Sequence, residues 1–146
     1  MTATRTDVAV DLRQAVQAFT AAQRRLRGRD AKAGGTTFAQ FQLLRLLAET
    51  DECAASTLAA EAGLSPASIT QALDHLAELG LVERVRSKAD RRVVLNRLTP
   101  AGRERFEVKQ AALEERWKDA LADLSADQLG QAAQVLRRMA EVLDAI

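Results

Sequence analysis

The sequence predicts a mainly α-helical protein with one small β-hairpin, and three features of its 146 residues predict this fold. Apolar residues recur at three- and four-residue steps along several long stretches, as they do in amphipathic helices. Two helical stretches are joined by a tight turn at residues 63–65. Two strand-like runs then flank a basic turn, which is the pattern of a hairpin.

Residues 6–29 are predicted to form the first helix. Its apolar stripe consists of Val8, Leu12, Ala15, Val16, Phe19, Ala22 and Leu26. Arginines at positions 24, 25, 27 and 29 stand near its end. They either complement the negative end of the helix macrodipole or contact phosphate, and the first interpretation is the simpler. Residues 30–36 are predicted to form a loop.

Thr37 is predicted to begin the second helix, with Gln40 completing a capping box. This helix should end near Glu49. Its core-facing residues are Phe38, Phe41, Leu43, Leu44, Leu46 and Leu47. Residues 50–55 should then connect it to the next helix. Cys53 lies in this connector without a basic neighbour that would favour a reactive thiolate, so a redox role is not favoured.

Residues 56–79 have the pattern of a helix-turn-helix. A short helix from Ser56 to Ala62 precedes the turn, and a second helix starts at Pro66 and runs to about Leu79. Ser65 is a suitable N-cap for the second helix, because its hydroxyl can accept from a free amide of the first turn. Proline at the first helical position loses no hydrogen bond, and Gly80 suits a left-handed C-cap.

The second helix has an apolar side, Ile69, Leu73, Leu76 and Leu79, and an outward side that is small and polar near its start. Ala67, Ser68 and Gln71 would let the helix approach base edges closely, and glutamine can pair with adenine through two hydrogen bonds. Thr70 should lie nearer to phosphates. His75 suits either a groove contact or solvent. A polar outer face alone is also what any amphipathic helix shows, so the hairpin that follows is needed for the functional interpretation.

The predicted hairpin comprises a strand with Val82 and Val85 and a second strand from Val93 to Leu98. Its basic residues, with one acid among them, are Arg84, Arg86, Lys88, Asp90, Arg91 and Arg92. A charge run is often only a solvated loop. Here it lies directly after a candidate DNA-recognition helix, where phosphates would be, so the hairpin is interpreted as a wing.

Leu58 to Gly102 resembles the winged helix-turn-helix of the MarR family of bacterial transcription regulators. The matching pieces are the LA…GLS start, the GLVER segment after the second helix, the D-x-R pair of Asp90 and Arg92, and the LTPAG that opens the next helix. The set in this order is specific. The resemblance implies one domain over 1–146, with a winged helix-turn-helix DNA-binding lobe at 36–99 and terminal helices 6–29 and 100–146 forming a dimerisation layer.

The resemblance also implies how such a protein works. Two chains form a homodimer that places one recognition helix in each major groove of a palindromic operator, with half-sites about 34–36 Å apart. It implies that Arg92 enters the minor groove while Asp90 holds the wing in shape. A small aromatic or phenolic effector could bind between the layer and the lobe and release DNA. Most such proteins repress and some activate. The candidate DNA-contacting residues are Ser65, Ala67, Ser68, Thr70, Gln71, His75, Arg84, Arg86, Lys88, Asp90, Arg91 and Arg92.

Thr99 is predicted to cap a long helix from Pro100 to about Leu124, and Ser125 with Gln128 to cap the last one. The last helix carries two adjacent apolar stripes, of which Leu136 and Met139 are representative. Such a width predicts burial against a partner chain, although one broad intramolecular core would also explain it. The candidate dimerisation residues are Val8, Leu12, Leu129, Leu136, Met139 and Leu143. An effector pocket would be lined by Phe19, Phe38, Phe41, Leu44 or Trp117. The simpler interpretation is that these residues pack the core and bind no ligand.

Composition excludes several classes. A net charge of +1 requires local rather than global clustering of basic residues for DNA binding. The single histidine and the lack of a phosphate-binding glycine loop argue against a His-based metal site and a nucleotide site, so no enzyme activity, cofactor or metal is expected. The lack of a long apolar run and of an apolar leader, with one cysteine, predicts a cytoplasmic protein without a membrane partner.

The alternative function is a winged-helix module for protein association without DNA binding, which would require a further catalytic domain.

Overall fold

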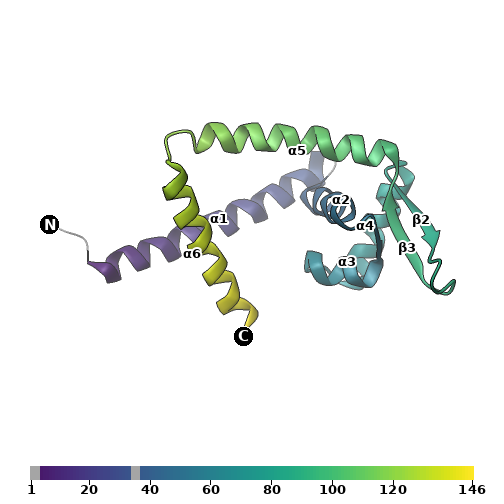
Figure 1. The fold of residues 1–146 in the computed structure, drawn as a ribbon, viewed down its shortest axis with the longest axis horizontal. Coiled ribbons are helices and arrows are strands. Elements are labelled where there is room, and N and C mark those ends of the chain that lie inside the picture. Colours follow the sequence, from purple (N-terminus) through teal and green to yellow (C-terminus); the bar gives the residue numbers. More distant parts are fainter. Residues whose placement is uncertain (1–3, 34–36) are drawn as a thin grey trace. The chain divides into compact units, whose positions relative to one another are not determined.

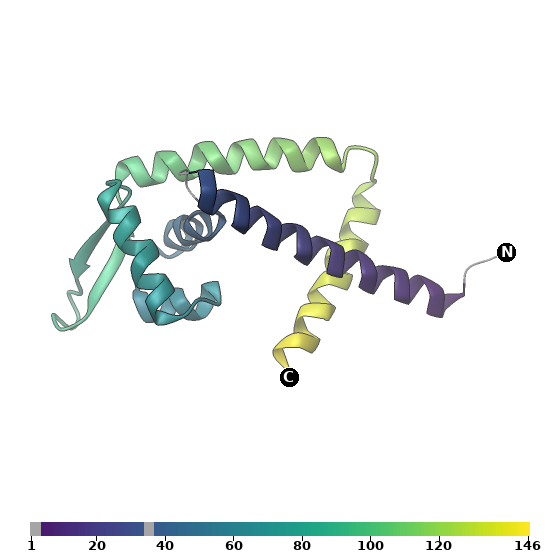
Figure 2. The same ribbon diagram turned by 180° about the vertical axis from the view of Figure 1, so that it is seen from behind.

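The computed structural model describes residues 4–33 and 37–146 and, for residues 27–33, the backbone only. Figure 1 shows the elements in order, and Figure 2 shows them from behind. They are α1 (Arg5–Ala33), α2 (Phe38–Thr50), β1 (Glu52–Ala54), α3 (Ala55–Ala62), α4 (Pro66–Glu78), β2 (Val82–Arg86), β3 (Val94–Leu98), α5 (Pro100–Ala120) and α6 (Ala126–Asp144). The chain divides into two compact units, Met1–Phe106 and Glu107–Ile146.

The predicted helix starts are confirmed by their hydrogen bonds. Thr37 Oγ1 accepts from the amide of Gln40, whose side chain accepts from the amide of Thr37, and Ser125 and Gln128 form the same capping box. Ser65 Oγ accepts from the amide of residue 68, which fixes the start of α4. Glycines 63 and 80 adopt φ values of 61° and 70°, the left-handed conformation that ends α3 and α4.

Three strands form one antiparallel sheet in the order β1-β3-β2. The prediction that residues 50–55 only connect two helices was therefore wrong, because residues 52–54 pair with β3. A strand of three residues is too short to show an alternating pattern, and only its long-range partner makes it a strand. On the exposed side, Arg97 of β3 bonds Glu83 of β2 at 2.7 Å and Glu52 of β1 at 3.4 Å, which ties the three strands together.

Two other boundaries differ from the sequence prediction by several residues, while the remaining ends agree within about one residue. α1 continues to Ala33, so the predicted loop at 30–36 is helical in its first part, and residues 34–36 lie outside the described residues. α5 ends at Ala120 rather than near Leu124. Residues 121–124 form a turn with an N–H···O bond of 3.1 Å from Leu124 to Leu121, which directs the chain into the cap of α6.

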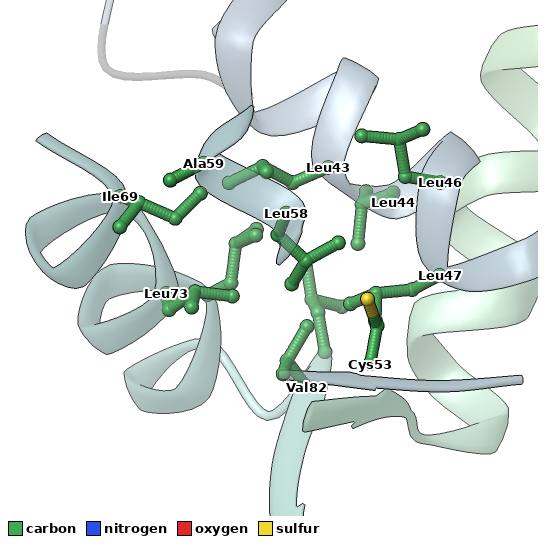
Figure 3. Close-up of a cluster of buried hydrophobic side chains, with 12 residues drawn as sticks. Leu43, Leu44, Leu46, Leu47, Cys53, Leu58, Ala59, Ile69, Leu73 and Val82 are labelled. Atoms are coloured by element: carbon green, nitrogen blue, oxygen red, sulfur yellow. The ribbon is translucent and has the colours of Figure 1, made fainter. Parts of the chain in front are cut away.

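The core of the first unit lies between α2, α3, α4 and the sheet (Figure 3). Its fully buried side chains are Leu43, Leu44, Leu47, Leu58, Ile69, Leu73 and Leu76. This confirms the predicted apolar sides of α2 and α4, with two exceptions. Phe38 is only half-buried, and Leu79 is 49% exposed because the helix ends at Glu78 and Leu79 forms its C-cap.

The start of α5 is fixed against the end of α4. Thr99 Oγ1 donates to the carbonyl of Gly80 at 2.6 Å and accepts from the amide of Gly102 at 3.0 Å, which confirms Thr99 as the cap. The Thr99 amide donates to the carbonyl of Leu81 at 3.1 Å. The backbones meet so closely that a Cβ built on Gly102 would lie 1.9 Å from the Leu81 oxygen. Only glycine fits at this joint.

The second unit holds the rest of α5 and all of α6. None of the α6 residues is buried, and Leu136, Val142 and Leu143 are 54%, 64% and 69% exposed. In the first unit, Val8 and Leu12 of α1 are also exposed, at 56% and 38%. Within residues 4–33 and 37–146, none of the helices combines the length and apolar character needed to span a bilayer.

Candidate nucleic-acid interface

The burial of one side of α4 determines which residues face outward. Ile69, Leu73 and Leu76 are at most 2% exposed, so the opposite side of the helix must face solvent. All candidate contact residues of the helix are exposed, namely Ser65, Ala67, Ser68, Thr70, Gln71 and His75. These residues therefore lie on the outward part of α4, away from the core, as the apolar periodicity predicted.

This face borders an open cavity of about 920 Å³. The start of α2, Thr37 and Gln40, forms one wall, and the outer face of α4 forms the other. Sequence reasoning did not anticipate the wall from α2, because nothing in the spacing of these residues shows that the two helices are neighbours. Asp74 and Glu78 also line the cavity, together with most of the predicted contact residues of α4.

The hydroxyl groups of α4 differ in what they can offer a ligand. Ser65 Oγ donates to Ser68 Oγ at 2.9 Å, so the Ser68 hydroxyl keeps its own hydrogen for an external acceptor. Thr70 Oγ1 already donates to the Pro66 carbonyl at 2.9 Å and retains only acceptor capacity. In the described part of the chain, the side-chain amide of Gln71 makes no hydrogen bond, so its two N–H donors and its oxygen acceptor remain available to a base edge.

We expect Gln71→Ala to change the preferred DNA sequence. The free amide of Gln71 can bond a base through two hydrogen bonds, and losing such a pair costs about 1–3 kcal/mol of discrimination at one base pair. Selection of binding sites from a random duplex library, carried out with both proteins, measures this change. Identical sequence preferences for wild type and Gln71→Ala would show that Gln71 does not read a base.

The tip of the wing, residues 87–93, is held by short-range hydrogen bonds. Ser87 Oγ accepts from the amides of Ala89 and Asp90 at 3.2 and 3.3 Å, and the Ser87 amide donates to the Val93 carbonyl at 2.9 Å. Arg86 Nη1 donates to the Arg91 carbonyl at 2.9 Å. Sequence reasoning missed Ser87, although a serine at the start of a hairpin turn is a signal for such bonding.

At this tip, Asp90 forms an ion pair with Arg92 and orients its guanidinium. Asp90 Oδ1 accepts from the amide of Arg92 at 3.0 Å and from its Nε at 3.2 Å, while Oδ2 accepts from Nη2 at 3.3 Å. The bonds from the Arg92 side chain, and secondly from its amide, hold the pKa of Asp90 below its usual value. The carboxylate is thus ionised at neutral pH and orients a side chain that is 92% exposed.

The remaining basic residues of the wing have different partners. Arg84 forms an ion pair with Asp74 of α4, a partner that sequence spacing could not show, because it depends on how the hairpin returns to the helix. Lys88 and Arg91 are exposed, and in the part of the chain that the structure describes neither forms an ion pair. Their charges are therefore available to phosphates.

The candidate effector-pocket walls are divided between core and surface. Phe41 and Leu44 are buried, and the ring of Phe41 stacks on Phe106 with 5.6 Å between centroids, so these residues pack the core. Phe19 and Trp117 are 49% and 47% exposed in their respective units. Within the described ranges, no three His, Cys, Asp or Glu side chains are grouped to hold a metal ion.

Comparison with known proteins places this geometry among transcription regulators. The sequence model of the MarR family matches residues 34–93. The chain is 36% identical over 105 residues, 72% of its length, to the uncharacterised HTH-type transcriptional regulator YdgJ of Bacillus subtilis. That match spans 64% of YdgJ, less than two thirds of its length.

Solved structures extend the comparison to nearly the whole chain. A probable transcriptional regulator from Pseudomonas aeruginosa is 30% identical, with a TM-score of 0.66 over 90% of this chain and 96% of that one. A mutant of MarR from E. coli complexed with operator DNA has a TM-score of 0.70 over 94% of this chain and 99% of that one. The second pair shares 22% sequence identity, so this likeness shows a common fold only.

Proposed function

Because this chain belongs to the MarR family of transcriptional regulators, we propose that it binds a palindromic DNA operator as a homodimer and regulates transcription there. The proposal rests on one observation: the outer face of α4 and the wing tip both have exposed side chains suited to DNA. The outer face of α4 is small and neutral at its start, and the wing tip presents Arg92 on a carboxylate clamp. Neither feature is needed for the core.

The two surfaces match different parts of a DNA duplex. A helix fits the major groove, where the free amide of Gln71 and the hydroxyl hydrogen of Ser68 can meet base edges. A narrow A·T-rich minor groove concentrates negative potential and attracts an exposed guanidinium such as that of Arg92. Lys88 and Arg91 would add phosphate contacts, which position the protein without reading sequence.

The proposed dimer uses α1, α5 and α6. The exposed apolar side chains of α1 and α6 support this, because contiguous exposed apolar surface marks interaction sites. A second copy of the chain would cover them symmetrically, since most soluble oligomers are symmetric homodimers. Two recognition helices would then meet half-sites about 34–36 Å apart on one side of the duplex.

Leu136→Glu is expected to abolish the dimer. Leu136 is 54% exposed in the single chain, so glutamate is tolerated there, but an unpaired carboxylate buried in an interface costs several kcal/mol. Light scattering at micromolar concentration should change from a dimeric mass to that of one 15.9 kDa chain. Gln134→Glu places the same charge at another exposed position of α6 and serves as the control. A wild-type protein that is monomeric at every concentration would contradict the proposed dimer.

We further propose that the protein acts in the cytoplasm as a repressor whose DNA affinity responds to a small aromatic or phenolic effector. An effector that favours one separation of the two DNA-binding lobes shifts the population away from the DNA-competent form, and the coupling is reciprocal. A panel of phenolic compounds, titrated against the preformed protein–DNA complex, tests this. Release of DNA by none of them would contradict an aromatic effector and leave DNA binding itself intact.

A gel-shift assay with the intergenic DNA upstream of the protein's own gene tests DNA binding directly. We expect a complex that survives competition by unrelated duplex and weakens steeply with salt, because phosphate contacts release counterions. Binding that is equal for all sequences, or absent at low salt, would instead favour a winged-helix module for protein association. Reporter transcription from the same DNA with and without the protein distinguishes repression from activation.

A further inference from the structure

The outward face of α4 changes its chemical character along its length. Its first two turns present Ala67, Ser68 and Gln71, which carry no charge. Its last two turns present Asp74 and Glu78 on the same cavity, and both are exposed. The negative end of the helix macrodipole lies at this acidic end. The carboxylates of Asp74 and Glu78, which flank His75, therefore make this end less favourable for a phosphate than the start of α4.

Asp74 is also bonded to the wing. Arg84 Nη2 donates to Asp74 Oδ1 and forms an ion pair between β2 and α4. The two side chains are 46% and 50% exposed, and exposed pairs of this kind contribute little to the stability of a fold. The consequence of the pair lies instead in the charge that this face of the lobe presents to DNA.

Arg84 differs in this respect from its neighbours in the wing. Arg86 bonds the neutral carbonyl of Arg91 and keeps its full charge. Lys88 and Arg91 form no ion pair within residues 4–33 and 37–146. The charge of Arg84, by contrast, is neutralised by Asp74, which belongs to the proposed recognition helix α4.

We propose that Asp74 determines specificity by withdrawing Arg84 from phosphate binding. This inference rests on the proposed function. Non-cognate complexes depend almost entirely on phosphate contacts, so the loss of one cation weakens them directly. A cognate complex is held in one register by its base contacts. The carboxylate thus weakens wrong complexes more than the right one, which is how specificity arises.

The test compares Asp74→Asn with wild type by fluorescence anisotropy over a salt series. The two probes are a duplex selected by the wild-type protein from a random library and a scrambled duplex of the same composition. We expect affinity for the scrambled duplex to rise about threefold or more, with a salt slope steeper by up to about 0.9, because one phosphate contact is gained. Affinity for the selected duplex should change less, so the ratio of the two affinities should fall.

Glu49→Gln is the matched control, because it removes one negative charge from a comparable exposed pair, Arg45–Glu49 on α2. This variant should keep the wild-type affinity ratio. If Asp74 acts through Arg84, the gain on scrambled DNA should be lost when Arg84→Ala is combined with Asp74→Asn. Circular dichroism verifies folding, and Asp74→Ala replaces the asparagine variant if that variant loses helical signal.

Two results would overturn the inference while the proposed function stands. One is an affinity ratio for Asp74→Asn equal to that of wild type. The other is a changed preference at a single base pair with unchanged affinity for scrambled DNA, which would make Asp74 a reader of cytosine. A wild-type protein that enriches no duplex from the random library would overturn the proposed function, and the role of Asp74 with it.

Discussion

Arg92→Ala should reduce affinity for the selected operator about tenfold or more, at unchanged fold and oligomeric state. The Arg92 side chain is 92% exposed and, in the described part of the chain, bonds only Asp90, so its loss removes the proposed DNA contact and no core packing. A base-level contact by arginine contributes about 1–3 kcal/mol. Fluorescence anisotropy on the operator over a salt series measures the loss, with circular dichroism as the folding control.

Two further variants of the wing tip distinguish recognition of the minor groove by Arg92 from simple attraction of a cation to phosphate. Lys88→Ala removes an exposed cation and should mainly flatten the salt dependence, by up to about 0.9 in slope for one phosphate contact. Asp90→Ala should behave as a milder form of Arg92→Ala, because it frees the guanidinium without deleting it. Wild-type affinity for Arg92→Ala at every salt concentration would mean that the wing does not read DNA in this protein.

Gly102→Ala should strongly destabilise the first unit, Met1–Phe106, which includes the start of α5. The added Cβ would lie 1.9 Å from the Leu81 oxygen, and this neighbour is backbone that cannot rotate away. The start of α5 must then move and break the bonds of Thr99 to Gly80 and Leu81. Overpacking costs about 1–3 kcal/mol and occasionally more, so we expect about 3 kcal/mol.

Urea unfolding at a fixed protein concentration measures this change, since the stability of a dimer depends on concentration. Gly130→Ala is the matched control. A Cβ at Gly130 meets nothing within 4 Å, and alanine is favoured over glycine within a helix, so this variant should gain about 0.5–1 kcal/mol. Equal midpoints for Gly102→Ala and wild type would show that the joint between α4 and α5 is looser than its geometry indicates.

The elements that sequence alone predicted well are those whose signals are local. Capping residues such as Thr37, Ser65 and Ser125 form the bonds that their spacing predicted, because an N-cap and its partner lie within one turn. The apolar sides of α2 and α4 followed from periodicity for the same reason. The hydrogen bonds between Asp90 and Arg92 agree with the wing-shaping role that the family resemblance implied for Asp90, while entry of Arg92 into a minor groove stays a prediction.

The features that were missed depend on contacts between distant segments. Residues 52–54 become a strand only because β3 lies beside them, and their composition carries no such signal. The ion pair between Asp74 and Arg84 requires the hairpin to fold back on α4. The close approach of Gly102 to Leu81 likewise depends on the angle between two helices. Apolar spacing determines which side of a helix is buried but not which neighbour covers it.

The order of the sheet has a consequence for the solubility of the protein. β3 is paired on both sides, so the open hydrogen-bonding edges belong to β1 and β2. Open edges invite pairing with strands of other molecules, which leads to aggregation. β1 is guarded by its length of three residues, and β2 by Glu83, Arg84 and Arg86. The charges of the hairpin thus also protect its outer strand from self-association.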